Sequence, residues 1–429
     1  MLDRSSIEAA YGARTPGSRA LMGRAAHSMP RGLTRTLSWF PPYPVVFERG
    51  AGPTVCDVDD NEYLDMFANG LSLIHGHAHP PITRALSAAL ARGTAWPGAS
   101  DAQIDFAELL CSRIPGAERV RFANTGTEAT MLAVKLARTI AGRDLIIKAW
   151  DAYHGSYADL EAGLEGHGEI AGRVALATFG ELDTYAAALD RHSGEVAAII
   201  VEPVQYTGVV TPPPDGFLPA LAGLARDAGV LLVLDDCLMF RLAEGGSAER
   251  YGIDADITCL GKWIGGGLPV GAIAARAELM DCFDSPGEGG LYHGGSFNGN
   301  LLGSVAGAIA VRDLTAAGIE RIDGHGERIR TAVEAAALEA GVPLRTSGVG
   351  SAFGIYVLDE PGGAIDRAAS SLLHLAAVNH GVYYGSGGEF GISTAFDDEA
   401  VGRAIDGLTN AIGDLAAAGA ASASVRETV

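Results

Sequence analysis

The sequence predicts an α/β fold, in which a large domain holds a mostly parallel seven-stranded sheet and a smaller α+β domain follows toward the C-terminus. Through the middle of the chain, short apolar runs alternate with segments of helical periodicity, which is the pattern of a layered α/β domain. From about Leu301 the pattern changes to long alanine-rich helices and short strands. The connections between the apolar runs are long enough for helical crossovers, so most neighbouring strands are expected to be parallel.

The seven expected strands of the large sheet are short runs rich in apolar residues. They are Arg119 to Ala123, Asp144 to Ala149, Val174 to Thr178, Ala197 to Glu202, Val230 to Asp235, Asp256 to Leu260 and Val270 to Arg276. The expected helices between them show apolar residues at helical spacing, and Gly229 is a suitable stop for the last. They are Thr127 to Ile140, Leu182 to Arg191 and Gly216 to Ala228.

The C-terminal part is expected to form a linker helix and a smaller lobe. Its expected helices are Leu301 to Ala317, Ile319 to Ala340, Ile365 to Asn379 and a closing helix from Asp397, and its expected strands are Ser351 to Leu358, Val382 to Tyr384 and Gly391 to Ala395. We therefore divide the chain into an N-terminal arm with a small-lobe segment (1–65), a large domain (66–311) and a C-terminal small domain (312–429).

Composition excludes several classes of function. The chain has 429 residues, 48% of them hydrophobic, so it can bury a large core. Its 31 basic and 52 acidic residues give a net charge of -21, which argues against nucleic acid and anionic membrane surfaces as partners. The five cysteines form no CxxC pair, and neither a signal peptide nor an apolar stretch of about 20 residues is present. A cytoplasmic location is expected.

Lys262 and Asp235 have the pattern of a site for pyridoxal 5'-phosphate. Lys262 lies between glycines, and Asp235 ends the apolar run that precedes it. This cofactor needs an amine that holds its aldehyde and an anion that keeps its ring nitrogen protonated, so that the ring can accept electrons. Taken alone, a lysine in a Gly-rich loop and an aspartate at a strand end are more often ordinary surface and strand-end residues.

Three further motifs follow expected strands, where parallel sheets place their ligands. Thr125, Gly126 and Thr127 open a helix, so they are expected either to hold a phosphate or to cap that helix. Tyr153 could stack on a planar ring or be an aromatic core residue. Glu202 follows another strand end on the same edge of the sheet.

Two other patterns are weaker. Ser296 lies in a glycine-rich stretch, where it could supply a hydroxyl to a phosphate or form part of a turn. His75, His77 and His79 have ligand-like spacing, but no carboxylate or cysteine cluster lies near them in the sequence. We interpret these histidines as structural and expect no metal site.

In this order, the motifs resemble those of the class III, fold type I pyridoxal-phosphate enzymes. The resemblance covers nearly the whole chain and is greatest to the branch that holds glutamate-1-semialdehyde 2,1-aminomutase and β-phenylalanine aminotransferase. The segments that carry it are Pro44 to Gly50, Asp57 to Tyr63, Gly76 to Pro80, Arg121 to Ala129 and Gly261 to Gly271.

The resemblance implies roles for the residues that match. Lys262 would form the Schiff base with the cofactor and move protons, and Asp235 would form a salt bridge with the pyridine nitrogen. The phosphate would be held by Thr125, Gly126 and Thr127.

Further cofactor contacts are implied by the same resemblance. Tyr153 would cover one face of the ring, and Glu202 would lie on the same cofactor-binding edge. Ser296 would reach the phosphate bound in the neighbouring subunit. Shared active sites of this kind imply a homodimer.

The chain departs from its relatives in three places. Relatives commonly read Asp-Glu-Val-Met-Thr where this chain has 235-DDCLM-239, and Gln205 replaces the asparagine that aminomutases place near the ring hydroxyl. The segment from Gly155 to Gly172 is shorter than the mobile lid of the aminomutases. The shorter segment argues against the aminomutase reaction.

Two residues are candidates for substrate binding. Arg35 matches the position at which this branch binds a substrate carboxylate, although it could also be a solvated arginine of the N-terminal arm. Glu389 replaces the arginine that many class III enzymes use for an α-carboxylate. It could pair with Arg35 or accept a substrate amine.

We therefore expect an aminotransferase that moves an amino group from a small amine or amino acid, including β-amino acids, to a keto acid or aldehyde. The first alternative is a 2,1-aminomutase of the glutamate-1-semialdehyde type. An alternative of another class is a catalytically silent pyridoxal-phosphate-binding protein. The residues leave the donor, the acceptor and the stereochemical preference open.

Overall fold

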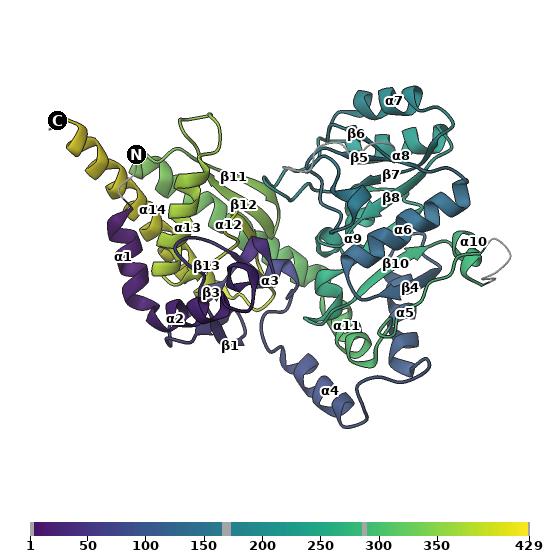
Figure 1. Ribbon diagram of the computed structural model, residues 1–429, viewed down its shortest axis with the longest axis horizontal. Coiled ribbons are helices and arrows are strands. Elements are labelled where there is room, and N and C mark those ends of the chain that lie inside the picture. The colour runs from purple at the N-terminus through teal and green to yellow at the C-terminus, as the bar shows by residue number, and fades with distance from the viewer. Residues whose placement is uncertain (1–3, 165–172, 285–289, 428–429) are drawn as a thin grey trace. The chain divides into compact units, whose positions relative to one another are not determined.

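The computed structural model describes residues 4–164, 173–284 and 290–427, and it divides into two compact units (Figure 1). One unit comprises Met1–His79 and Glu320–Val429, and the other comprises Pro80–Ile319. The sequence had placed its segment boundaries at residues 65 and 311. Residues up to 79 belong with the first unit because an antiparallel bridge joins Gly52 and His77.

The unit Pro80–Ile319 contains the seven-stranded sheet, in the order β4-β10-β9-β8-β7-β5-β6. All seven predicted strands are confirmed to within a residue or two. Pairing is parallel from β9 to β6, whereas β10 runs antiparallel to both of its neighbours. The strands are β4 (Arg119–Ala123), β5 (Leu145–Ala149), β6 (Val174–Ala177), β7 (Val196–Val201), β8 (Leu231–Asp235), β9 (Ile257–Leu260) and β10 (Gly271–Ala275).

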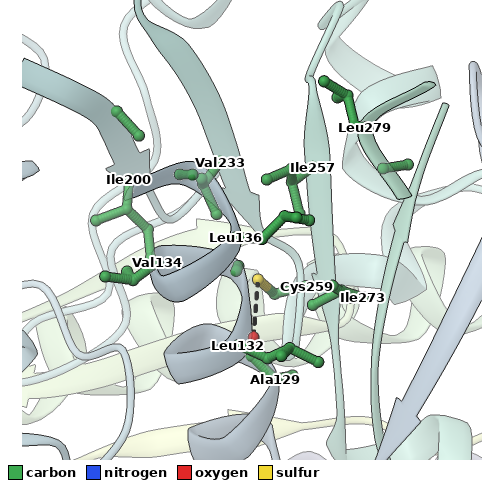
Figure 2. Close-up of a cluster of buried hydrophobic side chains, with 14 of the residues drawn as sticks. Ala129, Leu132, Val134, Leu136, Ile200, Val233, Ile257, Cys259, Ile273 and Leu279 are labelled. Carbon is green, nitrogen blue, oxygen red and sulfur yellow. Dashed lines mark hydrogen bonds between the residues drawn. The ribbon is translucent and has the colours of Figure 1, made fainter. Parts of the chain in front are cut away.

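Helices cover both faces of this sheet. On one face, α6 (Gly126–Ala141) packs its apolar side chains, and Figure 2 shows Leu132 and Leu136 beside Ile257 and Ile273 of the sheet. On the other face, the core is formed with α7 and α8. Because both faces are buried, the central strands read as continuous apolar runs rather than as alternating ones.

The described part of this unit contains eight α-helices. The full set is α4 (Pro80–Leu90), α5 (Asp101–Arg113), α6, α7 (Leu182–Arg191), α8 (Phe217–Asp227), α9 (Gly246–Tyr251), α10 (Ala277–Met280) and α11 (Leu301–Asp313). Thr125 caps the N-terminus of α6, and Gly142 ends the helix in the left-handed conformation.

Among the described residues, no single helix has the length and apolar composition needed to cross a membrane. In the described part of the chain, only the pair of α11 and α12 (Ala316–Ala340), which is bent at the break between them, passes that test together. Most of α11 is buried inside its unit, as in the core helix of a folded domain.

The unit of the N- and C-terminal segments contains two small sheets. One has the order β1-β2-β3-β13 and the other β11-β12-β14. Its strands are β1 (Phe47–Ala51), β2 (Thr54–Asp57), β3 (Glu62–Asp65), β11 (Leu344–Val349), β12 (Ala352–Val357), β13 (Val382–Tyr383) and β14 (Glu389–Gly391). Its helices are α1 (Ser5–Arg14), α2 (Pro16–Ala25), α3 (Ala68–Leu71), α13 (Arg367–Asn379), α14 (Asp398–Glu427) and most of α12.

The elements of this unit before residue 79 were not predicted from the sequence, and two strands of its C-terminal part also differ from the prediction. Strand β11 was not predicted, because it is a partly exposed edge strand without a clear apolar alternation. The strand predicted at Gly391 to Ala395 lies earlier, at β14, since the chain turns where the N–H of Phe396 bonds the carbonyl of Ser393.

A fully buried histidine lies in the core of the same unit. The ring of His374 contacts the rings of Phe40, Tyr383 and Tyr384, with centroids 4.6, 5.8 and 4.9 Å away. Neither ring nitrogen has a hydrogen-bond partner in the described part of the chain. Burial without a partner disfavours the charged ring and lowers the pKa of His374 to about 3.

This histidine should make stability depend on pH. The unfolded chain protonates His374 near its ordinary pKa of 6.5, while the folded chain resists protonation down to about 3. The stabilising contribution is therefore complete above pH 6.5 and is lost progressively as the pH falls. The unfolding free energy of the wild type should fall as the pH is lowered from 7 to 5. In His374→Phe this fall should be smaller by about 2 kcal/mol, as measured by urea denaturation at both pH values.

Tyr384→Phe is the control for this prediction, because burial raises the pKa of Tyr384 and its hydroxyl does not ionise between pH 5 and 7. Its effect on unfolding free energy should be the same at both pH values. An equal pH dependence in the wild type and His374→Phe would show that His374 is not the group responsible.

Candidate active site

The predicted cofactor residues gather at one edge of the seven-stranded sheet. Asp235 ends β8, Glu202 follows β7, Tyr153 follows β5 and Lys262 follows β9. Two successive antiparallel pairings, through β10, make β4 run in the same direction as β9. The start of α6 at Gly126 therefore lies at the same edge, as expected for ligand sites of open α/β sheets.

Glycines let the loops at this edge approach one another closely. A Cβ atom at Gly261 would lie 3.2 Å from the Cα of Gly126, and one at Gly155 would lie 2.5 Å from the Oγ1 of Thr127. Gly155 also has a φ of +92°, in the region that favours glycine. The structure thus brings together the Lys262 loop, the start of α6 and the loop that carries Tyr153.

The start of α6 combines a helix cap with backbone N–H groups that are suited to an anion. The Oγ1 of Thr125 accepts the N–H of Glu128 at 3.0 Å, which confirms the capping alternative for this hydroxyl. The N–H groups of Gly126 and Thr127 lie in the first turn, where no intrahelical acceptor exists. They are therefore the donors of this motif best placed to hold a phosphate.

Asp235 is a buried carboxylate that the structure keeps charged. Its Oδ2 accepts a hydrogen bond from the Nδ1 of His154 at 2.8 Å, and its Oδ1 accepts the N–H of Cys237 at 3.2 Å. Burial raises the pKa of Asp235, but its hydrogen bond with His154 and the charge of Lys262 oppose burial, and the pKa lies below its ordinary value. Asp235 is suited to pair with a protonated ring nitrogen.

His154 is a site residue that was not predicted from the sequence. The side chain is buried, and burial lowers the pKa of His154 below its ordinary value. A neutral ring must donate from Nδ1, because the ionised carboxylate can only accept. The sequence feature that pointed toward His154 is its position directly after Tyr153, which we did select.

Glu202 and Asp235 differ in their hydrogen bonds and in the direction of their pKa shifts. Its Oε2 accepts the N–H of Tyr153 at 3.0 Å, which positions the start of that loop. Burial, followed by the charge of Asp235, raises the pKa of Glu202 to about 8. At neutral pH the two carboxyl groups therefore carry mainly one negative charge, and it lies on Asp235.

Lys262 begins the 3-10 helix η5 (Lys262–Gly265) with a φ of +51°. This left-handed conformation is costly for a residue with a side chain, and such strain is found most often at functional sites. The side chain is partly buried, and its positive charge contributes to lowering the pKa of both Asp235 and Glu202. Lys262 and the two carboxyl groups therefore form one electrostatic cluster.

The residues that depart from the relatives have packing roles here. The Nε2 of Gln205 donates to the carbonyl of Trp150 at 2.5 Å. The carboxyl of Asp236 accepts from the N–H and the hydroxyl of Ser247 at 2.8 and 2.6 Å. The sulfur of Cys237 lies 3.1 Å from the position of a Cβ at Gly126. These substitutions therefore shape the loops around the site.

Ser296 is exposed, in a loop that is joined to the start of α6. The Nδ2 of Asn124 donates to the Oδ1 of Asn298 at 2.8 Å. This bond places the loop near the phosphate motif of its own subunit. The role of Ser296 toward a neighbouring subunit stays a prediction.

The two candidate substrate residues lie in the unit of the N- and C-terminal segments. Arg35 is exposed, and its Nη1 donates to the Oδ1 of Asn69 at 2.8 Å. Glu389 is partly buried, and burial raises its pKa although the N–H groups of Gly387 and of Glu389 itself oppose the shift. Among the described residues no ion pair joins Arg35 to Glu389, so the pairing that we considered is absent.

The three histidines of the HxHxH segment contact protein groups. The Nε2 of His77 bonds the Oδ2 of Asp65 at 2.6 Å, and the Nδ1 of His75 bonds the Oγ1 of Thr394 at 2.8 Å. The ring of His75 also stacks on that of His79. Within the described ranges, no three His, Cys, Asp or Glu side chains are grouped so that they could hold a metal ion.

Known proteins resemble the chain in sequence and structure. Glutamate-1-semialdehyde 2,1-aminomutase of Roseiflexus castenholzii is 36% identical over 81% of this chain and 84% of its own length. An omega-transaminase from Sphaerobacter thermophilus has a TM-score of 0.88 and 34% identity, over 94% of this chain and 99% of that one. A β-phenylalanine aminotransferase from Variovorax paradoxus has a TM-score of 0.87 and 30% identity, over 96% of both chains.

The family assignment rests on the length of the match. The sequence model of aminotransferase class III matches residues 38–411, which include every residue of the site described above except Arg35. The chain therefore belongs to the class III aminotransferase family.

Proposed function

We propose that this chain transfers an amino group from an amine that carries a carboxylate, with β-amino acids as the leading class, to a keto acid or aldehyde. The observation that carries the chemistry is the cluster of Lys262 with the charged Asp235 at the sheet edge. The choice of β-amino acids is supported by Arg35 and by the similarity to the β-phenylalanine aminotransferase.

Pyridoxal phosphate, the cofactor of this enzyme, fits the residues that the structure brings together. Gly126 and Thr127 offer N–H groups for the phosphate, and Asp235 offers a carboxylate for the ring nitrogen. Glycines at 155 and 261 keep side chains out of the space beside them. When bound, the cofactor supplies an electron sink for the carbon from which a proton is removed.

The protein's own part in the reaction is proton transfer and charge placement. The amine of Lys262 would remove the proton from the amine-bearing carbon of the substrate and deliver it to the cofactor rather than back to that carbon, so that the amino group stays behind. The charge of Asp235 keeps the ring nitrogen protonated, and His154 holds that carboxylate in place. The pKa of Glu202 is raised to about 8, so at neutral pH this carboxyl group is mostly uncharged and does not compete with Asp235 for the ring nitrogen.

A second candidate function is a 2,1-aminomutase, which returns the amine to a neighbouring carbon of the same molecule. The identity to the Roseiflexus enzyme favours it. Gln205 argues against it. Aminomutases have an asparagine near the ring hydroxyl at this place, whereas the side-chain amide of Gln205 donates to the carbonyl of Trp150. Residues 165–172 of the shorter segment after His154 lie outside the described part of the chain.

The assembly and location are also proposals. A homodimer with shared active sites is supported by the loop of Ser296, on which Tyr292 and Phe297 are 75% and 62% exposed. Large apolar side chains exposed together favour a protein partner. A cytoplasmic location is supported by the acidic charge and by five cysteines that are all free.

Keto acid dependence separates the candidate functions. With a β-amino acid alone, a transaminase should stop after one turnover per site and resume when a keto acid is added, as followed by product formation. A mutase given glutamate-1-semialdehyde should turn over without a keto acid. If no amine in a broad panel changes the absorbance of the bound cofactor, the protein is catalytically silent.

Lys262→Ala should abolish turnover while leaving the circular dichroism spectrum unchanged, because the group that moves the proton is removed. Lys135→Ala is the control and should retain turnover, because it removes an exposed lysine of α6 that bonds the carbonyl of Tyr292. Normal turnover in Lys262→Ala would contradict the assigned site.

Arg35→Ala should raise the KM for an amine that carries a carboxylate by about tenfold to a hundredfold, because a charged hydrogen bond is lost. The KM for an amine of the same skeleton without the carboxylate should stay the same. Arg31→Ala removes an arginine that stacks on Trp39 in the same segment, and it is the matched control. Equal effects on both amines would remove Arg35 from the substrate site.

Gly155→Ala should weaken cofactor binding by about tenfold or more, measured by titration of the apoprotein, because its Cβ would collide with Thr127 beside the phosphate donors. Gly142→Ala is the control, since Gly142 also has a positive φ, of +61°, but has open space around it. Both variants should lose stability through backbone strain. If both variants lose the same cofactor affinity, the loss comes from backbone strain and not from the collision of the new Cβ atom with Thr127.

A further inference from the structure

Lysine is rare in this chain, and one of its lysines is fully buried. The sequence has three lysines, at 135, 148 and 262, whereas arginine supplies the other 28 of its 31 basic residues. Lys148 lies in β5, where every residue is buried, and its own exposed fraction is 0%. A buried lysine needs partners for three N–H groups, so its surroundings show why it is there.

Three backbone carbonyls surround the ammonium group of Lys148. Its Nζ donates to the carbonyl oxygens of Ala152, Leu160 and Ala162 at 2.8, 2.9 and 2.7 Å. The three donors of an ammonium diverge from one atom and match three acceptors. The flat, fixed fork of a guanidinium does not have this geometry, which gives a physical reason for lysine in a chain that otherwise uses arginine.

These carbonyls come from the two ends of the loop 150–162, which follows β5 and carries Tyr153 and His154. The N–H of Asp151 also joins the start of the loop to the carbonyl of Gly163, just beyond its end, at 3.1 Å, and side chains of α6 hold the loop at single points. The hydroxyl of Thr130 donates to the carbonyl of His154 at 2.6 Å, and Arg138 forms an ion pair with Asp159 at 2.8 Å. Lys148 joins the start of the loop at Ala152 to its end at Leu160 and Ala162, so it closes the loop on itself.

We propose that Lys148 is a positioning residue for the cofactor site, because its ammonium holds the loop 150–162 in the shape that presents Tyr153 and His154. It touches neither substrate nor cofactor in this role, and it acts through those two residues. The proposal rests on the cofactor site and holds for a transaminase and a mutase alike.

The charge state of Lys148 makes this role sensitive to pH. Burial lowers the pKa of Lys148 to about 8, although the charges of Glu202 and Asp151 oppose the shift. Below that pH the ammonium has a donor for each carbonyl. Above it, a neutral amine has two N–H groups and turns a lone pair toward the third carbonyl, so the loop should loosen.

Hydrogen exchange of the apoprotein tests the proposal without depending on turnover. In Lys148→Met, the amides of Leu160 and Glu161, which are bonded to the carbonyl of Tyr157, should exchange about tenfold faster or more. Lys148→Arg should not restore their protection. Lys135→Met removes an exposed lysine with one carbonyl bond, and it should leave the loop unchanged.

Cofactor titration of the same proteins supplies the second measurement. Lys148→Met should bind pyridoxal phosphate about tenfold more weakly or worse, and the absorbance maximum of the bound cofactor should shift because a displaced His154 no longer bonds Asp235. Unchanged exchange in the loop, or unchanged binding and spectrum, would overturn the proposal. If the protein still turns over by the keto acid test, the proposed function survives that outcome.

The wild-type protein provides a test if Lys148→Met fails to fold. Between pH 6.5 and 9.5, protection of Leu160 relative to the β5 amides should fall as the pH passes about 8. Glu202 has a pKa raised to the same range, so the series is repeated in Glu202→Gln. Loss of the pH dependence in that variant, or its absence in the wild type, would exclude Lys148 as the cause.

Discussion

The site depends on keeping one negative charge, on Asp235, at a buried strand end. A carboxylate cannot stay ionised there unless its oxygens are bonded and positive charge lies near. His154 and the N–H of Cys237 supply the bonds, and Lys262 supplies the charge. Each of these partners is placed by the sheet edge, where six strands running in one direction end. The fold therefore selects where such a charge is tolerated, and the chemistry of the cofactor follows from that place.

The same constraint explains why the second carboxyl group differs in behaviour. Two carboxylates in one buried cluster repel each other, so one of them must hold a proton or lose its neighbour. Glu202 has its pKa raised to about 8 and uses an oxygen to accept the N–H of Tyr153. Asp235 keeps the charge because His154 bonds it directly. Identical functional groups thus take different roles through burial and hydrogen bonding, not through their identity.

Much of this could be predicted from the sequence. The seven strands of the large sheet were found because strands buried on both faces form continuous apolar runs, and Asp235 and Lys262 were found because charged residues end or follow such runs. Strand β11 was missed because a partly exposed edge strand has no such signal. His154 was missed because its importance depends on a contact 81 residues away in sequence. The role of Lys148 could not be predicted for a related reason, because its three carbonyl acceptors become neighbours only in the folded loop.

The proposed roles of the groups at the sheet edge suit an aminotransferase and an aminomutase equally well. Both reactions need an amine that moves a proton, a charged partner for the ring nitrogen and donors for the phosphate. Their difference lies in whether the first product leaves before the amine is returned, and that depends on residues that hold the substrate. In this chain, the candidates for that task are Arg35 and Glu389, which come from the N- and C-terminal segments rather than from the sheet. Substitutions in these two segments can therefore change which reaction is catalysed. The charge on Asp235 and the loop bound by Lys148 need not change.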